Sequence, residues 1–547
     1  MALNFSIILL GLWICILCEA QTNQVRHGHE KQQGEFLAGI EFASQFQTMD
    51  SCLHAQHAIE SPDCGLEPGK PSEHYNVQFQ MKHRSSHPLH EKQSKTESLE
   101  HSMLRDMYRI RGINIKAMAS SSQASLSKRG STESMTSVPT PQFASEKESS
   151  PQFRPSEASP SPSPAPLPWP QGISSHVESG VTLGSGEYFM DVYIGSPPRH
   201  FMLIMDTGSD LIWTQCNPCK NCYEQEGPLF TPNSSSSYRL VTCSEPQCKL
   251  VYNANPDEEC TEQKPHSCKY SYWYGDKSNT TGELALETMT FNLPNGHHYT
   301  LNGLVIGCGY SNYGLFRGAA GLLGLGKGPL SFPSQLHNRF GRKFSYCLVS
   351  RNSDLNVSSM LTFGEDERLT KHPHMQYTGF VNHTSAATFY YLSIAKVSVG
   401  GVDMLIPASA WTIGANGQGG TIIDSGTTLT YFVKEAYEQI VMAFESQIMY
   451  PKIQTSLLDH CFNVSGQTEV QLPTFSISFA DGAVLSPPLE NYFIEVETEP
   501  PILCLALLEA PAGSPSILGN YLQQNIHLLY DVGSHRLGFA HVACNAL

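Results

Sequence analysis

Two segments of the chain share one pattern: Leu203-Ile-Met-Asp-Thr-Gly-Ser-Asp-Leu-Ile-Trp213 and Thr421-Ile-Ile-Asp-Ser-Gly-Thr-Thr-Leu-Thr-Tyr431. Each begins with apolar residues and continues with Asp-(Thr/Ser)-Gly-(Ser/Thr). A leucine follows two residues after that tetrad, and an aromatic residue follows seven after the aspartate. A single copy is explained by a tight turn after a strand. Two copies with matching flanks indicate that the chain contains a duplicated unit.

A second element repeats behind each of these segments. Leu322-Leu-Gly324 and Ile517-Leu-Gly519 are both two apolar residues followed by glycine, and they end 118 and 95 residues after the aspartates of their halves. The longer first interval contains a cysteine-rich insertion at 216–268. We therefore expect two copies of one lobe, an N-terminal one over 181–350 and a C-terminal one over 355–547.

The pattern of apolar residues, glycines and prolines in residues 181–547 predicts a mainly β fold. Short runs with alternating apolar residues lie between glycine and proline, as in 187–195, and this period of two is typical of strands with one buried face. Helical patterns are few, and the strongest covers 433–448. The expected architecture is two duplicated β lobes.

Composition excludes several classes of protein. The chain has 547 residues, of which 40% are hydrophobic and 15% charged, which does not fit a disordered chain driven by charge. Its net charge of −16 is opposite to that of most nucleic-acid-binding proteins. We therefore expect no nucleic-acid partner.

The first residues predict export. An apolar run at 5–17 precedes Cys18-Glu-Ala20, which has small residues where a signal peptide is cleaved. We predict a signal peptide at 1–20 and a chain that enters the secretory pathway, for the cell exterior or the vacuole, without a membrane anchor. A signal anchor is the alternative. Five Asn-x-Ser/Thr sequons agree with export: Asn233, Asn279, Asn356, Asn382 and Asn463.

The cysteine count after residue 181 is even, which in an oxidising compartment favours disulfides. The twelve are Cys216, Cys219, Cys222, Cys243, Cys248, Cys260, Cys268, Cys308, Cys347, Cys461, Cys504 and Cys544. The first three are spaced as ligands of zinc or an iron–sulfur cluster would be, and this is the alternative interpretation.

The region ahead of the two lobes has two parts. Residues 136–175 are rich in serine and proline and predict an extended linker. Residues 21–135 are polar and rich in histidine, with one stretch of near-helical apolar spacing that carries arginines: Leu99, Met103, Met107 and Ile110, with Arg105, Arg109 and Arg111. It is interpreted either as a surface helix or as a basic helix that inhibits an acidic partner domain.

Over residues 181–547 the chain resembles a pepsin-like aspartic endopeptidase. The paired tetrads and both apolar-Gly elements carry the resemblance. The cysteine-rich insertion and Tyr272-Trp-Tyr-Gly-Asp276 resemble the nepenthesin-type plant branch. Residues 21–135 resemble a propeptide of the family loosely.

The resemblance implies a specific chemistry. Asp206 and Asp424 would meet across the lobe interface and share one proton, because two close carboxylates do not both ionise readily. One would take a proton from a bound water while the other protonates the scissile carbonyl. Protein or peptide substrates, an acidic optimum and no metal or cofactor follow. We expect a monomer.

The resemblance also assigns roles around the two aspartates. Backbone amides at Gly208 and Gly426 would approach the carboxylates, Thr207 and Ser425 would bridge the lobes, and Ser209 and Thr427 would bind the outer carboxylate oxygens. A flap with Tyr274, Gly275 and Asp276 would close over the substrate, with Trp213 bonded to the tyrosine. Lys277 departs from the pattern, since this branch often has a small residue there. It either alters substrate preference or points into solvent, and the second is expected.

The odd number of cysteines in each lobe predicts a disulfide between the lobes. The N-terminal lobe holds nine of the twelve cysteines and the C-terminal lobe three, so full pairing needs at least one bridge between them. Cys347–Cys544 is the natural candidate because the two lie near the lobe junction and the C-terminus. Cys461–Cys504 would then form within the C-terminal lobe.

A histidine-rich, arginine-bearing segment ahead of an acidic domain suggests a zymogen, activated at low pH by cleavage within 165–185. An alternative reading is a catalytically silent binding or inhibitor protein on the same fold, although both tetrads are intact. A serine hydrolase or a zinc protease is disfavoured because the chain contains neither Gly-x-Ser-x-Gly nor His-Glu-x-x-His.

Overall fold

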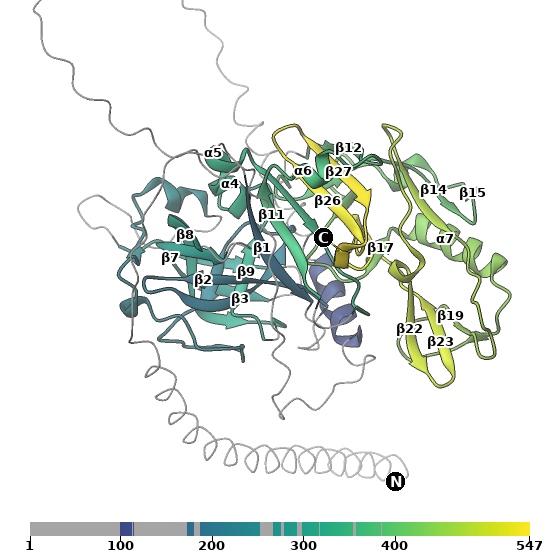
Figure 1. The fold of residues 1–547 in the computed structure, drawn as a ribbon, viewed down its shortest axis with the longest axis horizontal. Helices are drawn as coiled ribbons and strands as arrows, with labels where there is room; N and C mark the ends of the chain where they lie inside the picture. Colours follow the sequence, from purple (N-terminus) through teal and green to yellow (C-terminus); the bar gives the residue numbers. More distant parts are fainter. Residues whose placement is uncertain are drawn as a thin grey trace, which may run out of the picture. The chain divides into compact units, whose positions relative to one another are not determined.

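The computed structural model describes residues 99–111, 113, 172–179, 186–251, 266–274, 278–292, 298–316, 318–353, 357–383 and 386–546 (Figure 1). The compact unit that contains them is made mainly of strands, and its helices are short except for two. In these ranges no helix is both long and apolar enough to cross a membrane.

The N-terminal lobe is built from the strands β2 (Tyr188–Ile194), β3 (Arg199–Asp206), β4 (Trp213–Gln215), β5 (Arg239–Leu240), β6 (Lys269–Trp273), β7 (Asn279–Asn292), β8 (His298–Tyr313) and β9 (Gly321–Gly324). Alternate residues of β2 that were expected to share a face, Tyr188, Met190, Val192 and Ile194, are all buried in one core. Because β7 and β8 are long and pair along their whole length, they form the largest hairpin of the lobe.

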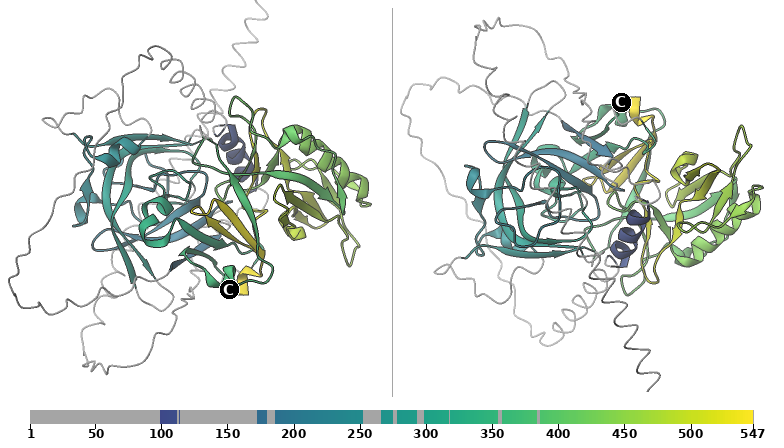
Figure 2. Two further views of the ribbon diagram at one scale, coloured as in Figure 1. Left: turned by 90° about the horizontal axis from the view of Figure 1, so that it is seen from above. Right: turned by 90° about the horizontal axis from the view of Figure 1, so that it is seen from below.

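The C-terminal lobe contains β13 (Tyr390–Leu392), β14 (Ile394–Val399), β15 (Val402–Asp403), β16 (Thr421–Ile423), β17 (Thr430–Phe432), β18 (Lys452–Ile453), β19 (Cys461–Asn463), β20 (Phe475–Phe479), β21 (Val484–Leu485), β22 (Phe493–Thr498), β23 (Pro501–Leu505), β24 (Leu507–Glu509) and β25 (Ser516–Leu518). Its one longer helix, α7 (Lys434–Gln447), buries Ala436, Ile440, Val441 and Phe444. α7 packs on β14 and β24 (Figures 1 and 2), so the helix predicted over 433–448 is present as a core element.

The sequence repeat is a structural repeat. β3 runs parallel to β9, with Asp206 opposite Gly324, and β16 runs parallel to β25. After each aspartate loop the chain returns antiparallel to the same partner strand, with Trp213 opposite Leu322 and Tyr431 opposite Ile517. The two halves therefore share one topology, in register with the two sequence patterns.

Glycine is needed at the end of each apolar-Gly element because two backbones meet there. A Cβ at Gly519 would overlap the carbonyl of Leu429, and one at Gly324 would collide with the backbone at Asp210 and Leu211. Any side chain would push the returning strand away from its partner.

A sheet connects the lobes. Its strands lie in the order β1 (Gly172–Ser179), β11 (Ser359–Gly364), β10 (Lys343–Cys347), β26 (Ile526–Asp531), β27 (Arg536–His541) and β12 (Gln376–Val381). Phe344 on β10 stacks on Tyr530 of β26, with ring centroids 4.5 Å apart. Since β10 (343–347) ends the N-terminal lobe and β26 (526–531) belongs to the C-terminal lobe, this sheet fixes one lobe to the other.

The remaining elements are single turns. They are the helices α4 (Phe332–Gln335), α5 (His337–Phe340) and α6 (Glu367–Thr370), and the 3₁₀ turns Pro232–Ser234, Pro246–Leu250, Ala408–Ala410, Leu489–Asn491 and Cys544–Ala546. A helix at 99–111, which continues at 113, precedes all of them.

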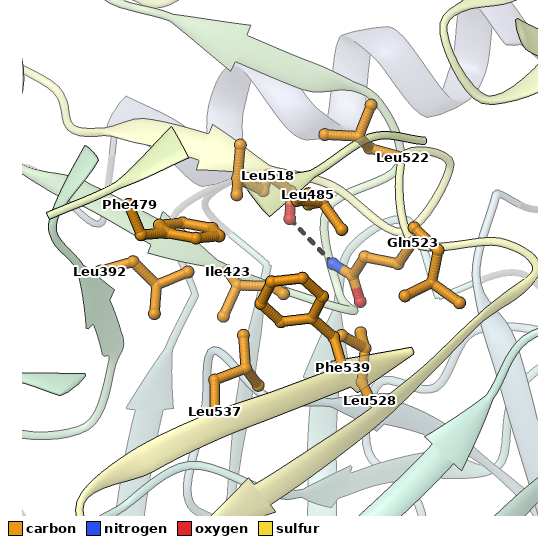
Figure 3. A pocket seen from close by; sticks show the side chains of 11 residues that line it. Leu392, Ile423, Phe479, Leu485, Leu518, Leu522, Gln523, Leu528, Leu537 and Phe539 are labelled. Carbon is orange, nitrogen blue, oxygen red and sulfur yellow. Dashed lines mark hydrogen bonds between the residues drawn. The ribbon is translucent and has the colours of Figure 1, made fainter. Parts of the chain in front are cut away.

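A small cavity lies in the core behind the second aspartate loop. Its volume is about 10 Å³ and aliphatic and aromatic side chains line it, with Gln523 as the polar exception (Figure 3). The amide of Gln523 donates to the carbonyl of Leu518 at 2.8 Å, so its hydrogen-bonding capacity is used in the wall. This cavity is a packing defect of the core and offers no chemistry.

One predicted boundary is wrong. Gly172–Ser179 forms β1, which pairs with β11 from Gly172 onward, whereas the linker was expected to reach residue 175. The prolines of the linker end at Pro170, and the serine-containing residues that follow pair with the edge of the connecting sheet. The regions predicted as signal peptide (1–20) and as most of the propeptide and linker lie outside the described residues.

Candidate active site

Two buried aspartates lie at equivalent ends of the repeated strands. Asp206 is the last residue of β3 and Asp424 directly follows β16, and neither side chain is exposed to solvent. Both carboxylates contact a single nitrogen, Nη2 of Arg109, which lies 3.2 Å from Asp424 Oδ1. The structure thus brings together the two aspartates that the sequence repeat singled out.

The glycine of each tetrad is close to both carboxylates. The N–H of Gly208 donates to Asp206 Oδ1 at 2.9 Å, and the N–H of Gly426 donates to Asp424 Oδ1 at 3.0 Å. A Cβ at either glycine would collide with the carboxylate of the opposite aspartate. Glycine is therefore required for the two loops to meet, in addition to supplying a donor.

The last residue of each tetrad binds the other carboxylate oxygen. Ser209 Oγ donates to Asp206 Oδ2 at 2.5 Å, and Thr427 Oγ1 donates to Asp424 Oδ2 at 2.6 Å. The two loops are thus nearly symmetric, and each carboxylate has one N–H and one O–H donor from its own loop.

The second residue of each tetrad crosses between the loops. The N–H of Ser425 donates to Thr207 Oγ1 at 2.8 Å, and the N–H of Thr207 donates to Ser425 Oγ at 3.1 Å. Ser425 Oγ in turn donates to the carbonyl of Met205 at 2.8 Å. These reciprocal bonds hold the two loops together beneath the aspartates.

The flap tyrosine position is partly described. Trp213 Nε1 donates to the hydroxyl of Tyr274 at 2.7 Å, the contact that the family resemblance implied. Tyr274 follows β6, and Gly275, Asp276 and Lys277 lie outside the described residues. Tyr272, two residues earlier, accepts a bond from the N–H of Asp210 at 3.4 Å.

Asp210 is a site residue that the sequence reasoning missed. Its carboxylate accepts from the N–H of Gly328 at 2.8 Å and from the hydroxyl of Thr388 at 2.6 Å. It joins the first aspartate loop to the C-terminal lobe. Its position directly after the first tetrad, where the second repeat has Thr428, is the signal that could have identified it.

The helix at 99–111, purple in Figure 1, contacts both aspartates through Arg109. Arg109 Nε donates to Asp424 Oδ2 at 2.9 Å, and Nη1 and Nη2 reach Asp206. A guanidinium fork is well suited to two carboxylates. Of the two interpretations of this segment, the geometry favours the basic helix that occupies an acidic site.

The preceding helical turn binds the C-terminal loop. Asp106 is fully buried, and its carboxylate accepts from the N–H groups of Thr428 and Leu429, both at 2.9 Å, and from the hydroxyl of Tyr431 at 3.5 Å. Nothing in the sequence pattern distinguished Asp106 from a surface carboxylate.

The helix also makes apolar contacts. Leu99, Ile110 and Ile113 are buried in the cluster that contains Leu429 and Tyr431 of the second repeat. Met103 and Met107 pack against the same cluster. The four apolar positions expected from the sequence thus face the C-terminal lobe, whereas Arg111 is exposed.

The pKa values of two carboxyl groups in the site are shifted in opposite directions. Burial by itself would raise the pKa of Asp206, but Arg109 and the donors of the loop hold this pKa below its usual value. At Asp106 burial dominates and raises the pKa to about 6, against the attraction of Arg105. The pKa of Arg109 is raised by the two carboxylates, although burial opposes this.

Disulfides account for the cysteines in the described ranges. The bridges are Cys216–Cys308, Cys219–Cys222, Cys248–Cys268, Cys347–Cys544 and Cys461–Cys504, and Cys243 is also bonded. The last two bridges are the pairs expected from parity. Since the three cysteines with metal-ligand spacing are all in disulfides, that alternative is wrong for this structure. Cys260 lies outside the described residues.

Among the predicted glycosylation sequons, Asn233 and Asn382 are exposed, and Asn279 and Asn463 are half-buried. Asn356 lies outside the described residues. Asn233 lies in the 3₁₀ turn Pro232–Ser234 and Asn382 directly follows β12, so both are open to solvent.

The fold and the paired aspartate loops define a pepsin-like architecture, and comparisons with known proteins agree. Family models described as "Xylanase inhibitor N-terminal" and "Xylanase inhibitor C-terminal" match residues 188–365 and 389–541. "Aspartyl protease family protein 2" of Arabidopsis thaliana is 40% identical over 69% of this chain and 74% of its own length. "Aspartic proteinase nepenthesin-1" of Nepenthes gracilis is 40% identical over 68% of this chain and 81% of its own.

Solved structures share the fold at lower identity. The crystal structure of edgp has a TM-score of 0.57 at 18% identity, covering 70% of this chain and 97% of that one. Basic 7S globulin from soybean has a TM-score of 0.53 at 19% identity, over 68% and 97%. The chain belongs to the pepsin-like aspartic endopeptidases, in the plant branch that includes the nepenthesins.

Proposed function

We propose that this chain is the secreted zymogen of an endopeptidase that hydrolyses peptide bonds at acidic pH through Asp206 and Asp424. The observation that carries the proposal is the near-symmetric pair of buried carboxylates, each held by its own loop and both bound by Arg109. Its substrates are proteins or peptides.

The chemistry follows from the pair once Arg109 has left. One carboxylate takes a proton from a water molecule, whose oxygen attacks the carbonyl carbon of the scissile bond, while the other carboxyl gives its proton to the carbonyl oxygen. The tetrahedral intermediate collapses with cleavage of the C–N bond: the carboxyl that took the water proton gives it to the departing amine, and the other carboxylate recovers its proton from a hydroxyl of the intermediate. The donors at Gly208, Gly426, Ser209 and Thr427 keep both carboxylates in place throughout.

The helix at 99–111 is the inhibitory element of this proposal. Arg109 occupies the position of the water and the scissile carbonyl, and Asp106 uses two N–H donors that an extended substrate would otherwise bind. A substrate does not reach the aspartates while the helix is docked. Activation therefore requires release of the helix, followed by cleavage before β1 or between β1 and β2.

The two shifted carboxyl groups act on this release in opposite directions. The pKa of Asp206 is lowered while the helix is docked. Asp206 therefore stabilises docking at any pH above the usual aspartate pKa, and this stabilisation is lost as the pH falls through the lowered pKa. Because the docked pKa of Asp106 is raised to about 6, its contribution is present at low pH and is lost as the pH rises through 6. Release of the helix at low pH is therefore caused by protonation of Asp206, whereas protonation of Asp106 opposes it.

Secretion is the part of the proposal that rests on the N-terminal sequence and the disulfides. Five described bridges fit an oxidising compartment. The cell exterior and the vacuole both satisfy this requirement and both can be acidic.

A paired assay tests the proposal. The chain without residues 1–20 is held at about pH 3–4.5, and cleavage of denatured globin is followed with and without a statine-type inhibitor, beside Asp206→Ala. Cleavage that the inhibitor blocks and that Asp206→Ala lacks supports the proposal. Folded, helix-free protein that does not cleave globin would contradict it and favour a catalytically silent binding protein.

A further inference from the structure

Besides Asp106, a further buried carboxylate lies next to the proposed active site. Glu187 directly precedes β2, its side chain is 3% exposed, and it forms an ion pair with Arg105 of the helix. Arg105 Nη2 also donates to the carbonyl of Gly426 at 3.0 Å and to the hydroxyl of Thr428 at 3.3 Å. One guanidinium is thus bound by a carboxylate, a carbonyl and a hydroxyl of the protease domain.

This set of acceptors lies beside the position of bond cleavage. Gly426 and Thr428 belong to the loop that carries Asp424. Arg105 and Arg109 are four residues apart on one helix, which corresponds to about 6 Å. An extended peptide covers that distance in about two residues. A substrate bound at Asp206 and Asp424 would therefore place a nearby side chain at the position of Arg105.

We propose that Glu187, the Gly426 carbonyl and the Thr428 hydroxyl form a substrate subsite that selects a basic side chain about two to three residues from the scissile bond. The proposal rests on the proposed function, since the helix has to leave before a substrate enters. Arg105 shows that the position accepts a guanidinium, and a substrate cation would restore the charge pairing that Glu187 loses with the helix.

The chemistry favours arginine over lysine. A planar guanidinium offers several N–H donors at fixed angles, and here three acceptors surround it, whereas an ammonium is a compact charge that is more strongly hydrated. An acidic side chain at the same substrate position would face Glu187 and be rejected. The subsite thus discriminates by charge and by shape.

The test compares two peptides that differ in charge alone. A neutral reference peptide with one scissile bond is synthesised with arginine at each position from three residues before that bond to three after it, and again with citrulline, which keeps the shape of arginine without its charge. Enzyme activated from the full chain is titrated with a statine-type inhibitor, so that kcat and KM refer to active molecules.

We expect one position at which arginine improves kcat/KM about tenfold over citrulline, mainly through KM. In Glu187→Gln the ratio falls to about one, in Glu187→Asp it is partly retained, and in Thr428→Val it falls less. Glu497→Gln, which removes an exposed charge on β22, is the matched control and should keep the ratio.

The experiment distinguishes failure of the proposed function from failure of the subsite proposal. If the wild-type enzyme does not cleave the neutral reference peptide, the proposed function fails. If it cleaves that peptide but shows no arginine preference at any position, or keeps the preference in Glu187→Gln, the subsite proposal alone is overturned. If Glu187→Gln yields too little active enzyme, the ratios of Glu187→Asp and Thr428→Val decide, and unchanged ratios in both contradict the proposal.

Discussion

The two aspartate loops have nearly the same local sequence and geometry, yet the hydrogen-bond partners of their fifth residues come from different parts of the chain. In the first loop, the fifth residue is Asp210, whose carboxylate binds Gly328 and Thr388 and whose N–H binds Tyr272. In the second loop, the equivalent residue is Thr428, whose N–H donates to Asp106 of the helix. The protease domain completes one loop itself and the helix completes the other.

The apolar neighbours show the same difference. Trp213 and Leu322 of the first repeat are packed with Tyr274 and Phe316 from the same lobe. Their counterparts Tyr431 and Ile517 are packed in a cluster with Leu99 and Ile110 of the helix. The helix therefore occupies the side of the site that the C-terminal lobe leaves open, and this is the side on which a substrate would find unused donors and apolar surface.

The largest effect is expected from the aspartates themselves. Asp206→Asn and Asp424→Asn should each lower kcat at least about a thousandfold, because each removes one of the two groups that exchange protons with water and substrate. The double variant should be no worse than either single one, since the pair acts as a unit. Single-turnover kinetics on globin, with helix-free protein prepared for each variant, measures this, and additive losses would contradict a shared role.

Removing Arg109 should separate inhibition from catalysis. Arg109→Gln takes away the charge-assisted bonds to both carboxylates, so the full chain should self-activate at least about tenfold faster near pH 5. Arg111→Gln, which removes an exposed arginine of the same helix, is the control and should activate at the wild-type rate. Release is followed as loss of the full-length band, and equal rates for both variants would contradict inhibition through Arg109.

Asp106 provides a finer test because its pH effect opposes that of Asp206. In Asp106→Asn the contribution to docking that is gained as the pH falls through 6 is absent. Its activation rate should therefore rise more steeply between pH 6 and pH 4 than that of the wild-type chain. The measurement is the slope of the logarithm of activation rate against pH. A slope equal to or shallower than the wild-type slope would contradict the role assigned to Asp106.

The smallest effect is expected where the domain completes its own loop. Thr388→Val removes the hydroxyl that donates to Asp210 at 2.6 Å and should destabilise the activated enzyme by about 1–2 kcal/mol. Thermal unfolding measures this change, and Thr412→Val, at an exposed threonine, is the control. A melting temperature equal to that of the control would show that Asp210 gains nothing from Thr388.

Much of the site was predictable because it depends on short, duplicated patterns. Asp206 and Asp424, the glycines and the hydroxyl residues that follow them are each defined by neighbours within a few positions, and the repeat doubled the signal. The Trp213–Tyr274 contact required the family resemblance, since nothing local links residues 61 positions apart. Parity and position near the lobe junction suggested the Cys347–Cys544 pair.

Other site residues were not predictable from local pattern. Asp106 and Glu187 read as ordinary surface carboxylates, and only their partners in space, Thr428 and Arg105, reveal that they are buried. The start of β1 was also misplaced, because a serine-rich stretch has little strand preference of its own and pairs only where β11 offers an edge.

The sequence by itself determined the duplicated β architecture, the two aspartates and the presence of a basic amphipathic helix, because period, spacing and repeated motifs are local properties of the chain. The tertiary structure alone decided that this helix lies on the aspartates, that it completes the second loop but not the first, and that Glu187 receives Arg105. These are contacts between residues more than eighty positions apart, and their free energies depend on burial and charge pairing, which exist only after the two lobes have met.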